Sequence, residues 1–368
     1  MLSPMLKILL PLLIVLIAIA AIVLQKPNVE QSPATKQEPN TEKQAPTTQN
    51  KNQLPVPKTH TIPLRHHTFQ TFNNCGPAAL SMMLSYFDIQ KSQQELGQKL
   101  RPYQNPQGNN DDKSVTLEEL AKESENLGLI PFHRPNGNIK KIKKFIAADI
   151  PVVTRTMLIP NDDIGHYRLI RGYDDTTNQL IQDDSLQAVN SKYTYDDFNI
   201  LWQPFNFEYL IAVPKQKEAI AREILGEEID EKIAWQNAKT NLLAQIQKNP
   251  NDTFAKFNLA NTNYHLGQYE EAKNTFEDVE TKLTFRTLWY QIEPILTYEA
   301  LGNDQKVFEQ TDKILNNHNR AFSELYVIRG NVYKKQQNFQ AARQEYEKAI
   351  FYNKNLEPEV NKKLQNLN

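Results

Sequence analysis

The sequence contains one cysteine, few glycines and no excess of basic residues. A single sulfur, that of Cys75, can form neither an intramolecular disulfide nor a thiolate zinc site, because both need several cysteines. Lys and Arg number 42 against 43 for Asp and Glu, so the broad positive field that non-specific nucleic-acid binding requires is absent. The 11 glycines form no phosphate-binding motif, and the seven histidines are too scattered for a metal cluster. We therefore expect no nucleic-acid partner, no metal and no organic cofactor.

The N-terminus carries an apolar segment that is typical of a membrane anchor. Residues 8–24 run for 17 positions without a charge, and 17 to 20 helical residues cover about 26 to 30 Å, the thickness of a hydrocarbon core. The run is longer than the core of a cleaved signal peptide, and no clean Ala-x-Ala site follows it. An uncleaved transmembrane helix within 1–24 is therefore favoured over a cleaved signal. Lys7 and Lys26 flank it on opposite sides and do not set its orientation, but the signal-like layout favours an extracytoplasmic location in the cell envelope.

Residues 25–60 have the composition of a disordered linker. They hold six prolines, are rich in Gln, Thr, Asn and Lys, and have almost no large apolar side chains, so they cannot bury a core. At roughly 150 residues per domain, the 368 residues of the chain leave room for two compact domains beyond this tether.

The first of these domains, residues 61–215, has an α+β pattern. Asn73 and Asn74 precede Cys75, Pro77 follows, and an apolar run continues to Phe87; an Asn cap with Pro in the first turn predicts the start of a buried helix. A second helix is expected over 116–127. Strands are expected over 151–156, 166–173 and 179–183, the last two forming a hairpin whose turn is 174–178.

The second domain, residues 216–368, is expected to be all α-helical and repetitive. Gly267, Gly302 and Gln337 lie 35 residues apart, each between two helical segments. Small residues such as Ala272 and Ala342 recur at matching positions, with a weaker copy between them and a leading helix pair over 220–247. This pattern resembles the tetratricopeptide repeat, which implies stacked helix pairs that bind a substrate or a protein partner.

Cys75 is the candidate nucleophile. At the start of a helix its sulfur would face the positive end of the helix dipole and unpaired backbone N–H groups, which favour the thiolate. A lone cysteine more commonly packs as a small apolar residue, so this position alone does not establish a catalytic role.

The residues around the predicted hairpin favour the catalytic interpretation. His166 opens one strand, and Asp183 and Asp184 close its partner. One of these carboxylates can orient the imidazole toward the thiol, but adjacent strand residues point to opposite faces, so only one of them can do so. We choose Asp183, with Asp184 as the alternative. Gln70, five residues before Cys75, can place its amide beside the Cys75 N–H as an oxyanion donor, although it can equally be a solvated loop residue.

These residues together resemble a known family. Gln70 to Leu80, then Gly165-His166-Tyr167, Gly172-Tyr173-Asp174-Asp175 and Asp183 are similar to the bacteriocin-processing, double-glycine-leader cysteine peptidases, in their broader peptidase-like branch. The resemblance covers about 62–214, including Tyr195-Asp196-Asp197-Phe198 and Trp202. It implies a papain-like fold with Cys75 as nucleophile, His166 as general base and acid, Asp183 as orienting group and Gln70 as oxyanion donor. Asp184-Ser185 stands where the family usually has Asp-Pro, and no transporter segment accompanies the domain, so processing of a double-glycine leader is not expected.

The leading hypothesis is a membrane-tethered, extracytoplasmic cysteine peptidase that hydrolyses a peptide or protein, with repeats that bind the substrate or a partner. A second hypothesis is an inactive peptidase-like binding module that acts as an adaptor around its repeats. The joint presence of Cys, His, Asp and Gln argues against it, because a fold alone does not need all four. A third hypothesis is a cysteine-dependent acyltransferase, which this sequence does not distinguish from a hydrolase.

Overall fold

The computed structural model describes residues 55–103, 113–317 and 319–367. Within these ranges no helix combines the length and the apolar character needed to cross a membrane. The anchor predicted within 1–24 and most of the linker predicted over 25–60 lie outside the described residues.

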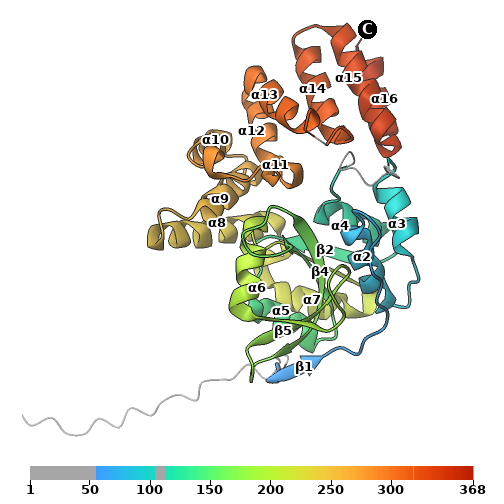
Figure 1. The fold of residues 1–368 in the computed structure, drawn as a ribbon, viewed down its shortest axis with the longest axis vertical. Helices are drawn as coiled ribbons and strands as arrows, with labels where there is room; N and C mark the ends of the chain where they lie inside the picture. The colour runs from blue at the N-terminus through green and yellow to red at the C-terminus, as the bar shows by residue number, and fades with distance from the viewer. Residues whose placement is uncertain (1–54, 104–112, 318, 368) are drawn as a thin grey trace, which may run out of the picture. The chain divides into compact units, whose positions relative to one another are not determined.

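A seven-stranded antiparallel sheet forms the centre of the first domain (Figure 1). Its strands pair in the order β2-β7-β3-β4-β5-β6, and β1 pairs with β4 off this path. The expected hairpin is present as β4 and β5. The strands are β1 Thr59–Thr61, β2 Ile130–Arg134, β3 Val152–Met157, β4 Gly165–Asp174, β5 Gln179–Asp184, β6 Ser191–Thr194 and β7 Tyr209–Val213.

Helices cover both faces of this sheet, so the mixed α and β character expected for the domain is confirmed. One face packs against α2 Cys75–Ser85, α3 Gln93–Leu100 and α4 Leu117–Asn126. The other face packs against α5 Ile139–Ala147, α6 Tyr195–Trp202 and α7 Glu218–Leu225. Leu169 of β4 joins the first core and its neighbour Ile170 joins the second, as the two-residue period of a strand requires.

Two predicted domain boundaries are displaced. Thr59 and His60, which the sequence assigns to the linker, belong to β1 and pair with the end of β4, so the folded domain begins before residue 61. At the other end, Ala221 and Leu225 of α7 pack into the core of the sheet domain, although composition places the start of the repeat domain at residue 216. Both segments are short, and only their packing reveals the domain to which they belong.

The second domain consists of paired helices. Its helical segments are α8 Glu231–Lys248, α9 Thr253–His265, α10 Tyr269–Glu277, α11 Thr287–Tyr290, α12 Glu293–Leu301, α13 Asp304–Leu315, α14 Ser323–Lys335, α15 Phe339–Tyr352 and α16 Glu357–Gln365. Gly267, Gly302 and Gln337 occupy equivalent places after α9, α12 and α14, with φ of 74°, 71° and 60°. A left-handed residue is the common way to end a helix, and the predicted 35-residue period is therefore confirmed.

The stretch between α10 and α12 departs from this period. In the last repeat, α14 begins at Ser323 and α15 ends at Tyr352, so a regular array would continue α10 to position 282 and begin the next helix at 288. Instead α10 ends at Glu277 and α12 begins at Glu293. The intervening residues, 278–292, form the 3₁₀ turn η4 Glu280–Lys282 and the single-turn helix α11.

Several contacts join the repeats to the sheet domain, among them the following two sets. Near α9 and α11, the Asn258 amide donates to the Gln203 carbonyl over 2.7 Å, and the Gln291 amide donates to the Pro204 carbonyl over 2.9 Å. At α14, the buried ammonium of Lys113 is paired with Glu324 and also with Glu119 of the sheet domain. These are specific polar contacts between the two domains.

Candidate active site

Cys75 is the first residue of α2, as the cap pattern predicts. Its residue is 9% exposed and lines a pocket, so the sulfur is neither sealed in the core nor free on the surface. The unpaired N–H groups and the positive dipole end of the helix favour a thiolate at this place.

The loop that leads into α2 is held in place by contacts with α3 and with Arg101, the residue that follows α3. Asn74 occupies the N-cap position, but its side chain does not cap the helix. Its Nδ2 donates to Thr71 Oγ1 over 2.8 Å, and its Oδ1 accepts from Arg101 Nη1 over 2.7 Å. A Cβ on Gly97 would lie 2.7 Å from the same oxygen, so α3 approaches this loop closely because that position is glycine. The backbone that carries Cys75 is therefore fixed on its N-terminal side.

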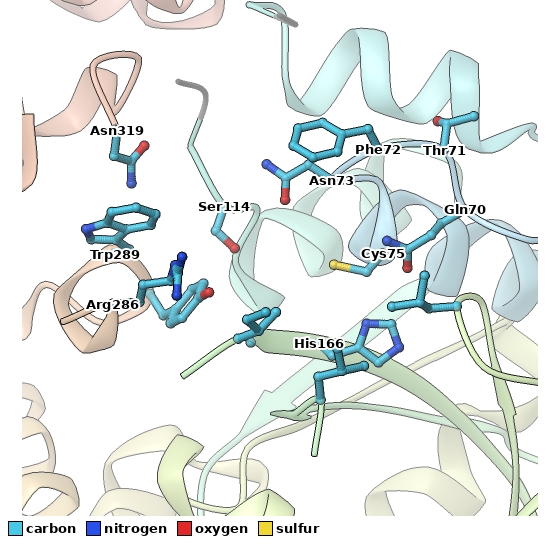
Figure 2. Close-up of a pocket in the computed structure, with 15 residues that line it drawn as sticks. Gln70, Thr71, Phe72, Asn73, Cys75, Ser114, His166, Arg286, Trp289 and Asn319 are labelled. Atoms are coloured by element: carbon cyan, nitrogen blue, oxygen red, sulfur yellow. The ribbon is translucent and has the colours of Figure 1, made fainter. Parts of the chain in front are cut away.

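His166 lies at the start of β4 and is oriented by a carboxylate. Its Nε2 is 2.8 Å from Asp184 Oδ1, and both side chains are buried. With Nε2 engaged by the carboxylate, Nδ1 is the ring nitrogen left for the thiol. Figure 2 shows the His166 ring beside Cys75 at the edge of the pocket. The structure thus brings the predicted Cys75 and His166 together.

The contacting carboxylate is Asp184, and the choice of Asp183 is corrected. Near the turn, Asp174 pairs with Gln179. If the same register continued along the strands, Asp183 would lie opposite Ile170. Ile170 and His166 share a face of β4, so Asp183 would then lie on the face of His166. A register shift between Ile170 and Gly172 slips the pairing by one residue. A slip of one residue exchanges the two faces of a strand, so Asp184 now lies on the face of His166.

Asp183 has a different environment. Its carboxylate accepts from Arg171 Nε over 2.8 Å and from the Asn190 N–H over 3.0 Å. Arg171 is the residue at the register shift, and its guanidinium is buried. Asp183 neutralises that buried positive charge. Nothing in this arrangement places Asp183 against the imidazole.

The electrostatics favour a proton on the imidazole over one on the sulfur. Burial raises the pKa of the Cys75 thiol, but a hydrogen bond to His166 and the charges of His166 and Arg155 outweigh burial and hold that pKa below its ordinary value. Burial lowers the pKa of His166, yet hydrogen bonds to Asp184 and Cys75 outweigh it, so the pKa of His166 is raised. The two opposite shifts move the pair toward a thiolate beside an imidazolium.

Gln70 lies beside Cys75 at the pocket wall, where sequence reasoning placed it (Figure 2). Its Oε1 accepts from the Ser185 hydroxyl over 2.8 Å, and its backbone N–H donates to the Ser185 carbonyl over 2.8 Å. Because the carboxamide oxygen accepts from Ser185, the amide N–H₂ is the end left to donate into the pocket. That is the end an oxyanion needs.

Sequence reasoning missed the residues that hold Gln70. Ser185, which follows the contacting carboxylate, fixes both its backbone and its side chain. Gln93 of α3 accepts from the Thr71 N–H over 2.8 Å and donates to the Phe69 carbonyl over 2.7 Å. The one available signal was Ser185 itself, a departure from the Asp-Pro pattern beside the candidate carboxylates.

Arg155 of β3 was also missed. Its guanidinium lies 5.0 Å from the ring centroids of Phe205 and Tyr290 and 5.5 Å from that of Tyr167. It donates to Ser114 Oγ over 2.9 Å and to the backbone carbonyl of Tyr290 over 3.1 Å. The only sequence signal was a cation inside a strand that is otherwise uncharged. The charge of Arg155 acts on the Cys75 thiol.

The pocket beside Cys75 has a volume of about 450 Å³. One side is formed by residues 70–75 and 158–166 of the sheet domain, and the other by residues of the repeat domain. Figure 2 shows Arg286, Trp289 and Asn319 across the pocket from Cys75 and His166. In the described part of the chain, no three His, Cys, Asp or Glu side chains are grouped to hold a metal ion.

Comparison with known proteins gives a match for each domain. Residues 46–210 match the model of the Peptidase_C39 like family, and residues 255–280 and 323–355 match that of the tetratricopeptide repeat. The repeat matches fall on the α9/α10 and α14/α15 pairs, and no curated protein matches the chain.

Two solved structures are similar to part of the chain. A protein from Bacillus anthracis described as a C39-like peptidase is 17% identical, with a TM-score of 0.37, over 43% of this chain and 99% of its own. The peptidase domain of Streptococcus ComA, a bi-functional ABC transporter of a quorum-sensing pathway, is 19% identical, with a TM-score of 0.32, over 42% of this chain and all of its own.

Proposed function

We propose that this chain, which joins a Peptidase_C39-like domain to tetratricopeptide repeats, is a cysteine peptidase that hydrolyses a peptide or protein. The observation that carries the proposal is the meeting of Cys75, His166 and Gln70 at one pocket wall, with the buried Asp184 bound to the His166 ring. A buried scaffold does not need a cysteine, an oriented imidazole and a free amide at the same opening.

Acylation begins with the Cys75 thiolate and the His166 imidazolium. The sulfur attacks the scissile carbonyl carbon, and the carbonyl oxygen becomes an oxyanion that accepts from the Gln70 amide and the Cys75 N–H. As the intermediate collapses, the C–N bond breaks and His166 Nδ1 donates its proton to the leaving amine. The acyl group remains on Cys75 as a thioester.

Deacylation reverses these roles. Neutral His166 takes a proton from water, and the resulting hydroxide attacks the thioester carbonyl carbon. The C–S bond then breaks, which releases a carboxylic acid product and restores the thiolate beside the imidazolium. Asp184 holds the ring in one orientation through both steps and stabilises its charged form.

The repeats and the N-terminus complete the proposal. We assign the repeats to binding of the substrate or a protein partner, since stacked helix pairs build such surfaces. We assign residues 1–24 to a membrane anchor that holds the enzyme outside the cytoplasm. Membrane fractionation of intact cells, followed by external protease treatment, tests this assignment; a soluble or protected chain would overturn it.

The test of activity uses the purified full chain and its Cys75→Ala variant on a peptide library. We expect products from the wild type and none from the variant, and the product masses separate hydrolysis from acyl transfer to an amine. A parallel assay measures iodoacetamide labelling of Cys75 at neutral pH, which should be faster in the native than in the unfolded chain and slower in His166→Ala. Equal rates in all three samples, with no cleavage, would overturn the proposal.

A further inference from the structure

The repeat domain contributes side chains to the pocket that holds Cys75. Arg286, Trp289 and Tyr290 line it, and all three lie in segment 278–292, where the 35-residue period is interrupted. A regular array would place the ends of two longer helices at 278–282 and 288–292, whereas this segment forms η4 and the single-turn helix α11. Local departures from a repeat pattern concentrate at functional positions, and this departure puts side chains at the pocket.

Tyr290 fixes the position of this segment relative to His166. A Cβ on Gly165 would lie 3.1 Å from the Tyr290 ring, so the ring packs where β4 begins, one residue before the imidazole. Arg155 binds the Tyr290 carbonyl at the same time. Segment 278–292 therefore packs directly against the start of β4, the strand that carries His166.

The surfaces of the pocket favour an uncharged, apolar substrate side chain. On the sheet-domain side, Phe72, Ile164 and Leu186 line the pocket and are 51%, 41% and 50% exposed. Across from them the indole of Trp289 borders the pocket, although the residue is only 6% exposed, and the guanidinium of Arg286 lies 5.3 Å from its ring. Large exposed apolar side chains around a concave site mark a binding surface.

Charge complements this apolar surface. Among the described residues that line the pocket, Arg286 and His166 are the ionisable cations and no carboxylate is present. Arg286 is paired with Asp163, which does not line the pocket. A basic substrate side chain would therefore lose its hydration without gaining a partner anion, which is costly.

Asn319 supplies a polar contact on the same wall. Its residue is 2% exposed, it lines the pocket, and its Oδ1 has no hydrogen-bond partner. Buried amide oxygens are nearly always paired. The backbone N–H of a bound peptide is the donor that would satisfy it.

We propose that Trp289 and Asn319 form a substrate subsite that receives a bulky apolar side chain of a peptide beside the scissile bond. The repeat domain then selects the substrate inside the catalytic cleft, in addition to any binding elsewhere on its surface. This inference rests on the proposed peptidase function and names its substrate class: peptides with large aliphatic or aromatic residues, and not Lys or Arg, next to the cleaved bond.

The test compares cleavage profiles of the full-length wild type, Trp289→Ala, Asn319→Ala and the control Phe339→Ala, an exposed aromatic of α15 that does not line the pocket. The wild type and the control should enrich large apolar over basic residues at one position flanking the cut. That enrichment should fall about tenfold or more in Trp289→Ala, the scale on which apolar subsites discriminate. Asn319→Ala should raise KM with the profile kept.

Iodoacetamide labelling of Cys75 distinguishes failure of the proposed subsite from failure of the proposed peptidase function. The reagent is too small to need the subsite, so Trp289→Ala should label as fast as the wild type, which also reports an intact fold. Fast labelling and cleavage with an unchanged profile in Trp289→Ala, or a wild-type preference for Lys or Arg, would overturn the subsite alone. Slow labelling with no cleavage in the wild type would overturn the peptidase function itself.

Discussion

Arg155 in the sheet domain donates a hydrogen bond to the backbone carbonyl of Tyr290 in the repeat domain, over 3.1 Å. The same guanidinium carries one of the charges that lower the pKa of Cys75, against the effect of burial. One side chain therefore both holds the repeat segment at the pocket and acts on the nucleophile.

Replacement of Arg155 by Met should make the thiolate less favoured. Loss of the positive charge raises the pKa of Cys75, so the midpoint of the pH profile of iodoacetamide labelling should move to higher pH. The Tyr290 carbonyl would also lose its partner, which costs about 1–3 kcal/mol of unfolding free energy. Arg155→Lys keeps the positive charge but loses the planar guanidinium, so its midpoint should move less than that of Arg155→Met. An unchanged midpoint in Arg155→Met would contradict this role.

The two adjacent carboxylates should behave differently when each becomes an amide. Asp184→Asn removes the anion that raises the pKa of His166. The value of kcat/KM should therefore fall about 10²- to 10⁴-fold, as in other enzymes whose catalytic histidine loses its orienting carboxylate. Asp183→Asn breaks the buried pair with Arg171 and should cost about 3–5 kcal/mol of stability. The folded fraction of Asp183→Asn should keep its kcat.

Steady-state kinetics together with urea unfolding of both variants provide the measurement. A larger kinetic loss in Asp183→Asn than in Asp184→Asn would restore the assignment made from sequence and contradict the register of β4 and β5.

The buried ammonium of Lys113 should stabilise the contact between the domains. Lys113→Met leaves Glu119 and Glu324 without their partner and should cost about 3–5 kcal/mol of unfolding free energy. Lys91→Met is the matched control, because the side chains of Lys91 and its partner Glu95 are 39% and 56% exposed and such pairs contribute only about 0–1 kcal/mol. Equal losses in the two variants would show that the Lys113 pair is not effectively buried.

This pair also predicts a pH dependence. Burial raises the pKa of Glu324, but the charge of Lys113 outweighs it and the pKa lies below its ordinary value. A group with a lowered folded pKa contributes stability above its unfolded pKa and loses it as pH falls through the folded value. The difference in unfolding free energy between wild type and Lys113→Met should therefore shrink as pH falls below the ordinary range of Glu.

Gly330 should tolerate no side chain. A Cβ there would lie 2.4 Å from the Tyr346 ring, so Gly330→Ala should cost about 1–3 kcal/mol through overpacking. Thermal unfolding measures this loss. Adding Tyr346→Leu should cost less in the Gly330→Ala background than in the wild type, because it removes the clashing ring. Strictly additive losses would place the two side chains out of contact.

The sequence by itself determined the features that depend on neighbouring residues. Asn74 and Pro77 mark the start of the helix that carries Cys75, and the 35-residue spacing of Gly267 and Gly302 marks the ends of equivalent helices. A helix start is read from a few adjacent positions, and a repeat is read from one spacing along the chain. Neither requires knowledge of how distant segments pack.

Tertiary structure alone decided which carboxylate meets His166. A single irregularity at Arg171 moves the register of β5 and replaces Asp183 by Asp184, and strand pairing is a property of two segments, not of one. The same holds for Arg155, whose charge acts on Cys75, and for Trp289, which lines the pocket; they lie 80 and 214 residues from Cys75 in the sequence. Their positions follow from how the sheet and the repeats pack, since residues so distant along the chain meet only when the whole fold is formed.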